Sequence, residues 1–319
     1  MAKIGSISIN GRITLDMHSL NNEGGEGNQV LTRQVTIIDE NGKPATVTAV
    51  SGDMMKHIMC EHFWTIAKEE NLPLSNTSSL FNANRIIPSD LPNAQANDHI
   101  VTTDEVLKTC SLSDIAGAMI TGLGNFSRKS IAEFGWLVAL PEANETENYF
   151  HAKYVPDAKT KKEEESENEE KKKENVSQNI FHRPANSGIY AFVGNLEILR
   201  LGYNDISKKY PISDEEREKR YKSLLKSLLY TFIKPNGAMR NIQNPHIVNF
   251  EGVITYSTST CPAPTVSALN SKYKEEIEKI TKYLNEISNN SLTTIPFTSL
   301  SGFTEEFKKL INTTEPKKL

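Results

Sequence analysis

The chain has 319 residues, of which 37% are hydrophobic, so it is long enough to bury one large core or two smaller ones. Its net charge of −4 and its pI near 6.0 exclude a generally basic nucleic-acid coat, and any nucleic-acid site must be a local basic patch. Cys60, Cys110 and Cys261 form no CxxC pair, which indicates reduced thiols, and no apolar run approaches the ~20 residues of a membrane span. We expect a cytoplasmic protein without a membrane contact.

The first predicted element is a strand over residues 3–17. Apolar residues alternate with polar ones along it, at Ile7, Ile9, Ile13, Leu15 and Met17, which is typical of a strand with one buried and one polar face. A flexible polar loop is expected over residues 18–28, where three glycines and three asparagines let backbone N–H groups approach a ligand. An Asn-Gly pair within residues 40–43 predicts a hairpin turn.

A helix is predicted to begin after Ser51, its expected N-cap, and to end near residue 71. Lys56 projects from the first turns, beside unpaired N–H groups that favour anions, so this site would suit a phosphate backbone. Residues 72–127 have weak periodicity and many helix breakers, which indicates an insertion. Only residues 103–123 have helical spacing, with Met119 among the apolar positions.

The next strand is predicted over residues 131–140, where an almost wholly apolar pattern indicates a central place in a sheet. Residues 142–184 then form a long excursion. Its run of six lysines and seven glutamates over residues 159–174 cannot bury enough apolar surface to order itself. We therefore expect a solvated, disordered tip over residues 157–178.

The remaining elements are a strand over residues 187–193, a helix behind Ser213 and Glu216, which have capping-box spacing, and a strand over residues 247–256. Amphipathic helices are expected within residues 261–319. The order is β-α-β-β-α-β, with an insertion after the first helix and an excursion between the second and third strands. This order predicts an α+β fold of the ferredoxin-like, split βαβ type that RNA-recognition folds also use.

Several segments carry a more specific signal. Residues 11–24 read GRITLDMHSLNNEG, residues 51–57 SGDMMKH, residues 182–192 HRPANSGIYAF and residues 234–241 KPNGAMRN. In these four segments the chain resembles the CRISPR-associated DevR autoregulator family, whose members are the repeated backbone subunits of type I (I-B-like) Cascade complexes. The match covers most of residues 3–257.

The resemblance implies a division of the chain into palm, fingers and thumb. The RRM-like palm would comprise residues 1–71, 128–141 and 185–260, the fingers the mixed helical insertion 72–127, and the β-hairpin-like thumb residues 142–184. Residues 261–319 would add C-terminal helices. Copies of such a subunit line up head to tail along one CRISPR RNA, contact other Cascade subunits and present the guide to a target DNA strand.

By the same resemblance, two sets of residues are candidates for RNA contacts. The crRNA-binding set is Asn22, Asn28, Arg33, Ser51, Lys56, His57 and Arg240. The thumb residues expected to stack on or wedge between bases are Phe150, Tyr154, Phe181 and His182. The alternatives are that Lys56 is merely solvated, that Arg240 caps the preceding helix, that His57 is a packed core histidine, and that the thumb aromatics pack the hairpin on itself.

Two other functions stay open. The first is a metal-dependent RNA endonuclease. His57, Cys60 and His62 are three possible ligands on one helix, although only the pair three residues apart shares a face, and related subunits that cleave RNA carry a catalytic Asp after the first strand. Residues 18–36 hold Glu23 and Glu26 but no Asp, so we expect a binding protein without catalytic residues, metal or cofactor. The second is a generic single-stranded RNA binder, which would lack a fixed repeat per subunit.

Overall fold

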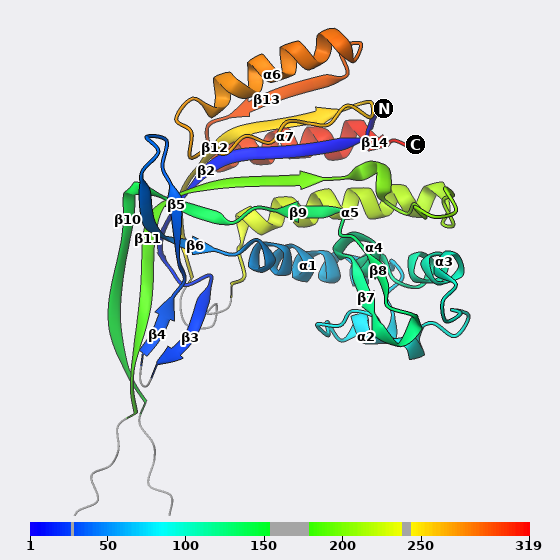
Figure 1. Ribbon diagram of the computed structural model, residues 1–319, viewed down its shortest axis with the longest axis horizontal. Coiled ribbons are helices and arrows are strands. Elements are labelled where there is room, and N and C mark those ends of the chain that lie inside the picture. The colour runs from blue at the N-terminus through cyan, green and yellow to red at the C-terminus, as the bar shows by residue number, and fades with distance from the viewer. Residues whose placement is uncertain (27–28, 154–178, 238–243) are drawn as a thin grey trace, which may run out of the picture.

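The computed structural model describes residues 1–26, 29–153, 179–237 and 244–319. Its central element is a sheet in which neighbouring strands follow the order β13-β12-β2-β11-β10-β6-β5 (Figure 1). Each strand in this series is antiparallel to the next. The strands are β2 (Ser6–His18), β5 (Gln34–Ile38), β6 (Pro44–Val50), β10 (Leu137–Lys153), β11 (Asn179–Leu196), β12 (His246–Ser257) and β13 (Leu292–Phe297). With the helices around it, this sheet confirms the predicted α+β class.

Three helices cover one face of the sheet: α1 (Gly52–Glu69), α5 (Asp214–Ile233) and α7 (Leu300–Thr313). The alternate apolar residues predicted for β2, from Ile7 to Leu15, are buried against them. Aromatic rings fill the space between α5, α7 and the sheet, because Phe250 lies 4.6 Å from Phe232 and 4.8 Å from Phe303, measured between ring centroids. This cluster is the main hydrophobic core.

The opposite face of β2 is polar, as its sequence indicates, but it is buried under an extended C-terminal strap, residues 263–268. Ser8 donates a hydrogen bond to the Pro264 carbonyl at 2.7 Å, and Asn10 accepts one from the Val266 N–H at 2.9 Å. Arg12 donates to the Ala268 carbonyl at 2.9 Å. The polar side chains therefore satisfy strap backbone groups that would otherwise be buried without partners. Helix α6 (Tyr273–Ile287) continues over this face.

The insertion folds as short helices and a small hairpin beside the far end of α1 (Figure 1). Its elements are α2 (Asn76–Ser79), η1 (Pro88–Asp90), α3 (His99–Thr109), α4 (Ser111–Ala116), β7 (Ala118–Ile120), η2 (Thr121–Leu123) and β8 (Phe126–Arg128). The single helix predicted over residues 103–123 is wrong, because the backbone is extended at Cys110 and Gly117 ends α4 with a positive φ of 78°. Met119 lies on β7 and is 74% exposed rather than buried.

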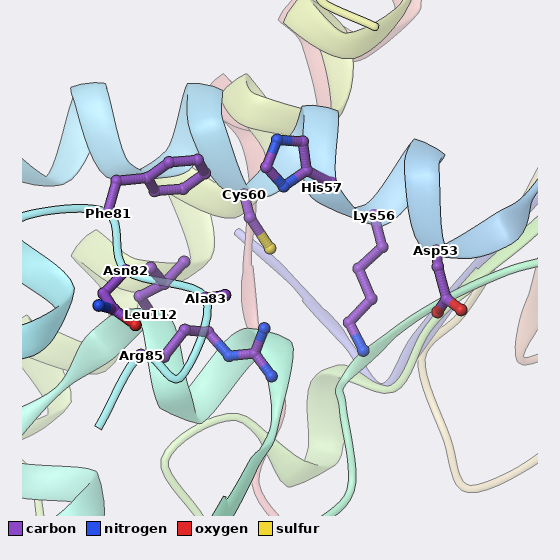
Figure 2. A pocket seen from close by; sticks show the side chains of 9 residues that line it. All are labelled: Asp53, Lys56, His57, Cys60, Phe81, Asn82, Ala83, Arg85 and Leu112. Atoms are coloured by element: carbon purple, nitrogen blue, oxygen red, sulfur yellow. The ribbon is translucent and has the colours of Figure 1, made fainter. Parts of the chain in front are cut away.

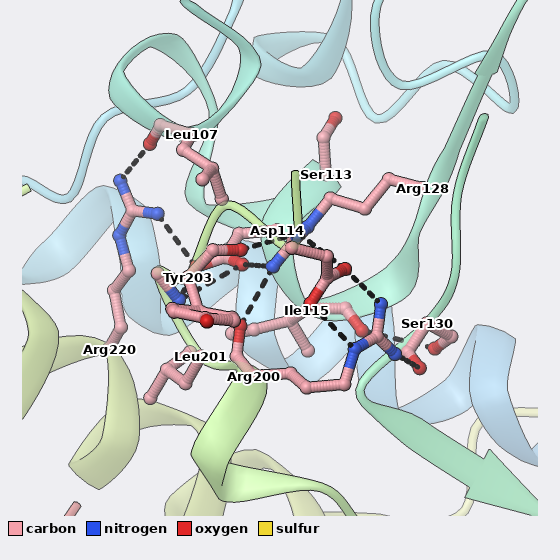
Figure 3. Close-up of polar contacts among 12 residues, drawn as sticks. Leu107, Ser113, Asp114, Ile115, Arg128, Ser130, Arg200, Leu201, Tyr203 and Arg220 are labelled. Carbon is pink, nitrogen blue, oxygen red and sulfur yellow. Dashed lines mark hydrogen bonds and ion pairs between the residues drawn. The ribbon is translucent and has the colours of Figure 1, made fainter. Parts of the chain in front are cut away.

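A buried ion cluster joins the insertion to α5 (Figure 3). The carboxylate of Asp114, on α4, accepts hydrogen bonds from Arg128 at 2.6 Å and from Arg220 of α5 at 2.9 Å. It also accepts one from the Gly202 N–H at 3.0 Å, in the turn after η3 (Ile198–Arg200). All three charged side chains are at least 98% buried, so their orientation depends on these bonds.

The excursion predicted over residues 142–184 begins and ends as paired strands. Residues 144–153 of β10 pair with residues 179–188 of β11 and form a two-stranded ribbon, which extends away from the sheet (Figure 1). The strand predicted over residues 131–140 is interrupted at Gly135, which separates β9 (Ala132–Phe134) from β10. A Cβ atom at Gly135 would lie 2.5 Å from Val193, so the chain passes β11 there at a distance that only glycine allows.

Two further expectations are wrong. Residues 18–28 do not form only a loop, because β3 (Asn22–Glu26) pairs with β4 (Gln29–Thr32), and β4 lies beside the ribbon. The tail is not purely helical: α6 and α7 match the prediction, but β13 forms an edge of the sheet, and β14 (Thr314–Pro316) pairs with β1 (Ala2–Ile4). In the part of the chain that the structure describes, no helix has both the length and the apolar character needed to cross a membrane.

Candidate nucleic-acid interface

Helix α1 begins at an N-terminal cap that is closed by a side-chain hydrogen bond. Ser51 is extended, and its hydroxyl accepts a hydrogen bond from the Met54 N–H at 3.1 Å, as the sequence predicts. The same hydroxyl donates to the side-chain oxygen of Asn21 at 3.1 Å. Ser51 is buried, so its first role is to begin the helix and to join it to the segment after β2.

Lys56 lies in the second turn of α1 and lines a pocket of about 310 Å³ between this helix and the insertion (Figure 2). Its side chain is half-buried, and burial lowers the pKa of its ammonium group below the ordinary value. Within the described residues it forms no ion pair, although the nearby carboxylates of Asp53 and Glu133 act to raise its pKa. The lining residues are Asp53, Lys56, His57, Cys60, Phe81, Asn82, Ala83, Arg85 and Leu112.

His57 is exposed at the same pocket, and its ring centroid lies 5.4 Å from that of Phe81. The alternative that it is a packed core histidine is therefore wrong. His62, five residues further on, turns to the other side, where its Nε2 lies 2.9 Å from the Lys234 carbonyl oxygen. Burial raises the pKa of the Cys60 thiol to about 11, which disfavours the thiolate that binds metals. Among the described residues there is no group of three or more metal-ligating side chains.

Arg33 lies between β4 and β5, with its guanidinium 5.2 Å from the ring centroid of Trp136. Trp136 is 41% exposed at the interruption between β9 and β10, although its strand pattern predicted a place in the apolar face. A guanidinium over an indole face forms a cation–π contact, which orients the arginine. This pair therefore presents a positively charged, partly aromatic surface beside the root of the ribbon.

On the ribbon, Phe150 of β10 is 70% exposed and pairs across the strands with the half-buried His182 of β11. Phe150 therefore does not pack the hairpin on itself and is free to contact a base. At the ribbon's root, Asn186 accepts hydrogen bonds from Thr32 at 3.1 Å and from Thr146 at 2.9 Å, which links β4 to both ribbon strands.

A buried histidine supports this root. His18, at the end of β2, is 1% exposed and packs edge-on against Tyr190 with 5.0 Å between ring centroids. Burial lowers the pKa of His18 to about 4, so the imidazole is neutral at physiological pH. Its Nε2 has no hydrogen-bond partner in the described structure, which is consistent with a role in packing.

Several predicted site residues are not placed in full. Asn28, Tyr154 and Arg240 lie outside the described residues. For Asn22 and Phe181 only the backbone is described: Asn22 pairs with Thr32 in the β3–β4 hairpin, and Phe181 pairs with His151 in the ribbon. Their contacts with RNA remain predictions.

Comparison with known proteins decides the family. The family model described as "CRISPR-associated negative auto-regulator DevR/Csa2" matches residues 9–278, which is most of the chain. The chain belongs to the DevR/Csa2 family. A curated relative from Methanocaldococcus jannaschii, the CRISPR-associated protein Cas7/Cst2/DevR, is 26% identical over 237 residues, which cover 70% of this chain and 72% of the relative.

The fold of this DevR/Csa2 family member also has solved counterparts. A chain of a CRISPR RNA-guided surveillance complex, described as pre-nicking, superposes with a TM-score of 0.51 and 10% identity. The superposition covers 96% of this chain and 99% of the other. At this identity the likeness concerns the fold alone.

Sequence reasoning missed Arg85, which the structure places at the pocket beside Lys56 and His57 (Figure 2). It lies in the Asn-rich, Pro-containing part of the insertion, where the sequence has no periodicity from which a side-chain direction could be predicted. Its approach to α1 depends on the fold of this DevR/Csa2 family insertion, which no local pattern encodes.

Proposed function

We propose that this DevR/Csa2 family member is a crRNA-binding backbone subunit of a type I CRISPR Cascade complex. Copies would polymerise head to tail along the guide RNA, contact other Cascade subunits and present the guide for pairing with a target DNA strand. Family membership supports this proposal, as does the likeness in fold to a chain of an RNA-guided surveillance complex.

The strand order supports the finer fold assignment. Within the sheet, β12, β2, β11 and β10 are neighbours in that order, and α1 and α5 pack on one face. This is the arrangement expected of a split βαβ unit, so we assign a ferredoxin-like, RRM-like palm to these elements. Residues 72–127 would then be the fingers and residues 142–184 the thumb.

The observation that carries the proposal is the position of Lys56. It is a half-buried cation without an ion pair in the described structure, it lines a pocket beside α1, and a second cation, Arg85, lies across that pocket. An uncompensated cation in a partly buried site costs stability unless a ligand neutralises it. A phosphate of a single-stranded RNA has the required charge.

The test is to purify the chain with its genomic neighbours and to sequence the bound RNA. We expect repeat-derived RNA of uniform length, and an affinity that falls with salt at a slope of ~0.7 per neutralised phosphate. Lys56→Ala should lower that slope. Because a repeated subunit meets its neighbours through two different faces, sedimentation should show open rows, and an exclusive two-fold dimer with bound RNA would contradict the proposal.

We further propose that the chain binds RNA without cleaving it. The segment after β2 offers no Asp for metal-assisted hydrolysis, and the two histidines of α1 point away from each other. Incubation of the purified complex with target RNA and divalent ions should leave the RNA intact. Cleavage that depends on the divalent ion would favour the endonuclease alternative.

A further inference from the structure

The pocket beside α1 receives cations from two separate parts of the chain. Lys56 reaches into it from α1, and Arg85 reaches into it from the insertion, and Figure 2 shows the two side chains directed into the same space. Asp53 lies at the edge and contributes one negative charge. Neither cation forms an ion pair with a carboxylate among the described residues, and Glu133, which lies near Lys56, is paired with Lys129 at 2.5 Å.

Arg85 is held rigidly toward this space. Its backbone has a positive φ of 59°, which is unfavourable for an arginine. The surrounding structure maintains this conformation, since the hydroxyls of Ser75 and Ser78 both donate to the Arg85 carbonyl, the first at 2.7 Å. Its Nε donates to the Gly117 carbonyl at 3.0 Å, which fixes the guanidinium beside the pocket. Strained residues held in this way are concentrated at binding sites.

The two like charges also repel each other. Arg85 is one of the groups that lower the pKa of Lys56, after burial, whereas Cys60, Asp53 and Glu133 act in the opposite direction. A group with a single compact negative charge and several acceptor oxygens would relieve the repulsion. A phosphodiester fits this description and accepts paired hydrogen bonds from a guanidinium.

We propose that Lys56 and Arg85 bind one phosphodiester of single-stranded RNA between them, so that the insertion supplies half of a phosphate site whose other half is on α1. The inference rests on the proposed RNA-binding function and deepens it. Because both cations contact the same phosphate, RNA joins the insertion to the helix. Arg85 is then an RNA-binding residue, although it lies outside the segments that suggested the family.

The first test measures binding of the full chain to a 3′-fluorescein-labelled single-stranded oligoribonucleotide by anisotropy. Arg85→Met keeps the aliphatic stem and the positive φ but removes the charge, and it should weaken binding ~10-fold or more, as should Lys56→Met. The double variant should lose clearly less than the product of the two single losses, because either cation alone holds the shared phosphate poorly. Lys279→Met, on α6 across the sheet, should bind as the unaltered chain does.

The second test does not require variants to fold. Phenylglyoxal modification followed by peptide mapping should label Arg85 in the free chain, and bound RNA should protect it. Arg12, which is half-buried on the opposite face of the sheet, should be labelled equally with and without RNA. Protection of Arg85 by polyglutamate but not by RNA would overturn the inference and indicate an acidic protein segment instead.

The outcomes separate the two proposals. If the unaltered chain binds RNA, but Arg85→Met binds equally well and RNA does not protect Arg85, only the phosphate site is wrong. Independent losses that multiply in the double variant also overturn the shared site. If the unaltered chain binds no RNA even with its genomic neighbours, the proposed function fails and this inference fails with it.

Discussion

The insertion and the ribbon are both departures from the central sheet, but they are attached to it in different ways. The insertion is fixed by a buried ion cluster at Asp114 and holds Arg85 by three hydrogen bonds. The ribbon is anchored at its root by His18 and Asn186 and carries Phe150 largely exposed to solvent. For the proposed RNA-binding function, we therefore expect phosphate contacts on the rigid surface beside the insertion and base contacts on the slender, exposed ribbon.

The largest effect is expected from breaking the ion cluster. Asp114→Ala leaves Arg128 and Arg220 buried without their shared carboxylate, which should cost about 3 to 5 kcal/mol in the free energy of unfolding. Urea unfolding followed by circular dichroism would measure this. The control is Glu305→Ala on α7, whose carboxylate is 66% exposed and pairs with Lys309 at 3.0 Å, and its cost should stay below about 1 kcal/mol. Equal costs would remove the distinction between a rigidly fixed insertion and the rest of the surface.

The next effect concerns the root of the ribbon and depends on pH. Burial lowers the pKa of His18 to about 4 in the folded chain, whereas an unperturbed histidine, as in the unfolded chain, has a pKa of 6.5. The unfolded chain therefore binds the proton more tightly. Stability from this group is present above pH 6.5 and is lost as the pH falls through 4, by about 3 kcal/mol in total.

His18→Phe keeps an aromatic ring against Tyr190 and removes the titration. Unfolding free energies measured from pH 7 to pH 4 should therefore fall less steeply in this variant than in the unaltered chain. Identical slopes in the two proteins would show that His18 does not support the root in the way described.

A smaller effect is expected on the ribbon itself. Phe150→Ala should leave stability unchanged, because the side chain is 70% exposed, but should weaken RNA or target pairing by about 1 to 3 kcal/mol through the loss of a stacking contact. It should also blur the regular nuclease footprint along the guide. Tyr283→Ala on α6, at a residue that is 63% exposed on the other side of the sheet, is the matched control and should change neither property.

The smallest effect is expected from the charged run. Residues 159–174 carry six lysines and seven glutamates, so their net field on a polyanion is small. Replacing them with a short Gly-Ser linker should leave RNA affinity almost unchanged in the anisotropy assay. A loss as large as that of Lys56→Ala would place part of the binding surface in this run and would contradict the division between ribbon arms and tip.

Local patterns predicted the elements whose stability depends on nearby residues. The alternation in β2 from Ile7 to Leu15, the N-cap at Ser51 and the N-cap at Ser213 were confirmed, since each depends on period or on a side chain within three residues, whereas Met17 at the end of β2 is 40% exposed. The family resemblance, also readable from the chain, was confirmed by the match over residues 9–278. These features are determined by interactions between residues close in sequence and by short sequence motifs.

Tertiary structure decided the rest. The polar face of β2 is buried because a strap more than 250 residues away in the sequence supplies backbone partners for it. Strand β13 was not predicted, because its place at the edge of the sheet depends on its pairing with the distant β12. Arg85 could not be found from its neighbours, because its place opposite Lys56 follows from hydrogen bonds to Gly117 and from the fold of the insertion. The sequence alone therefore determined the main elements and the family, whereas long-range contacts determined which side chains meet at the pocket, because no local period encodes them.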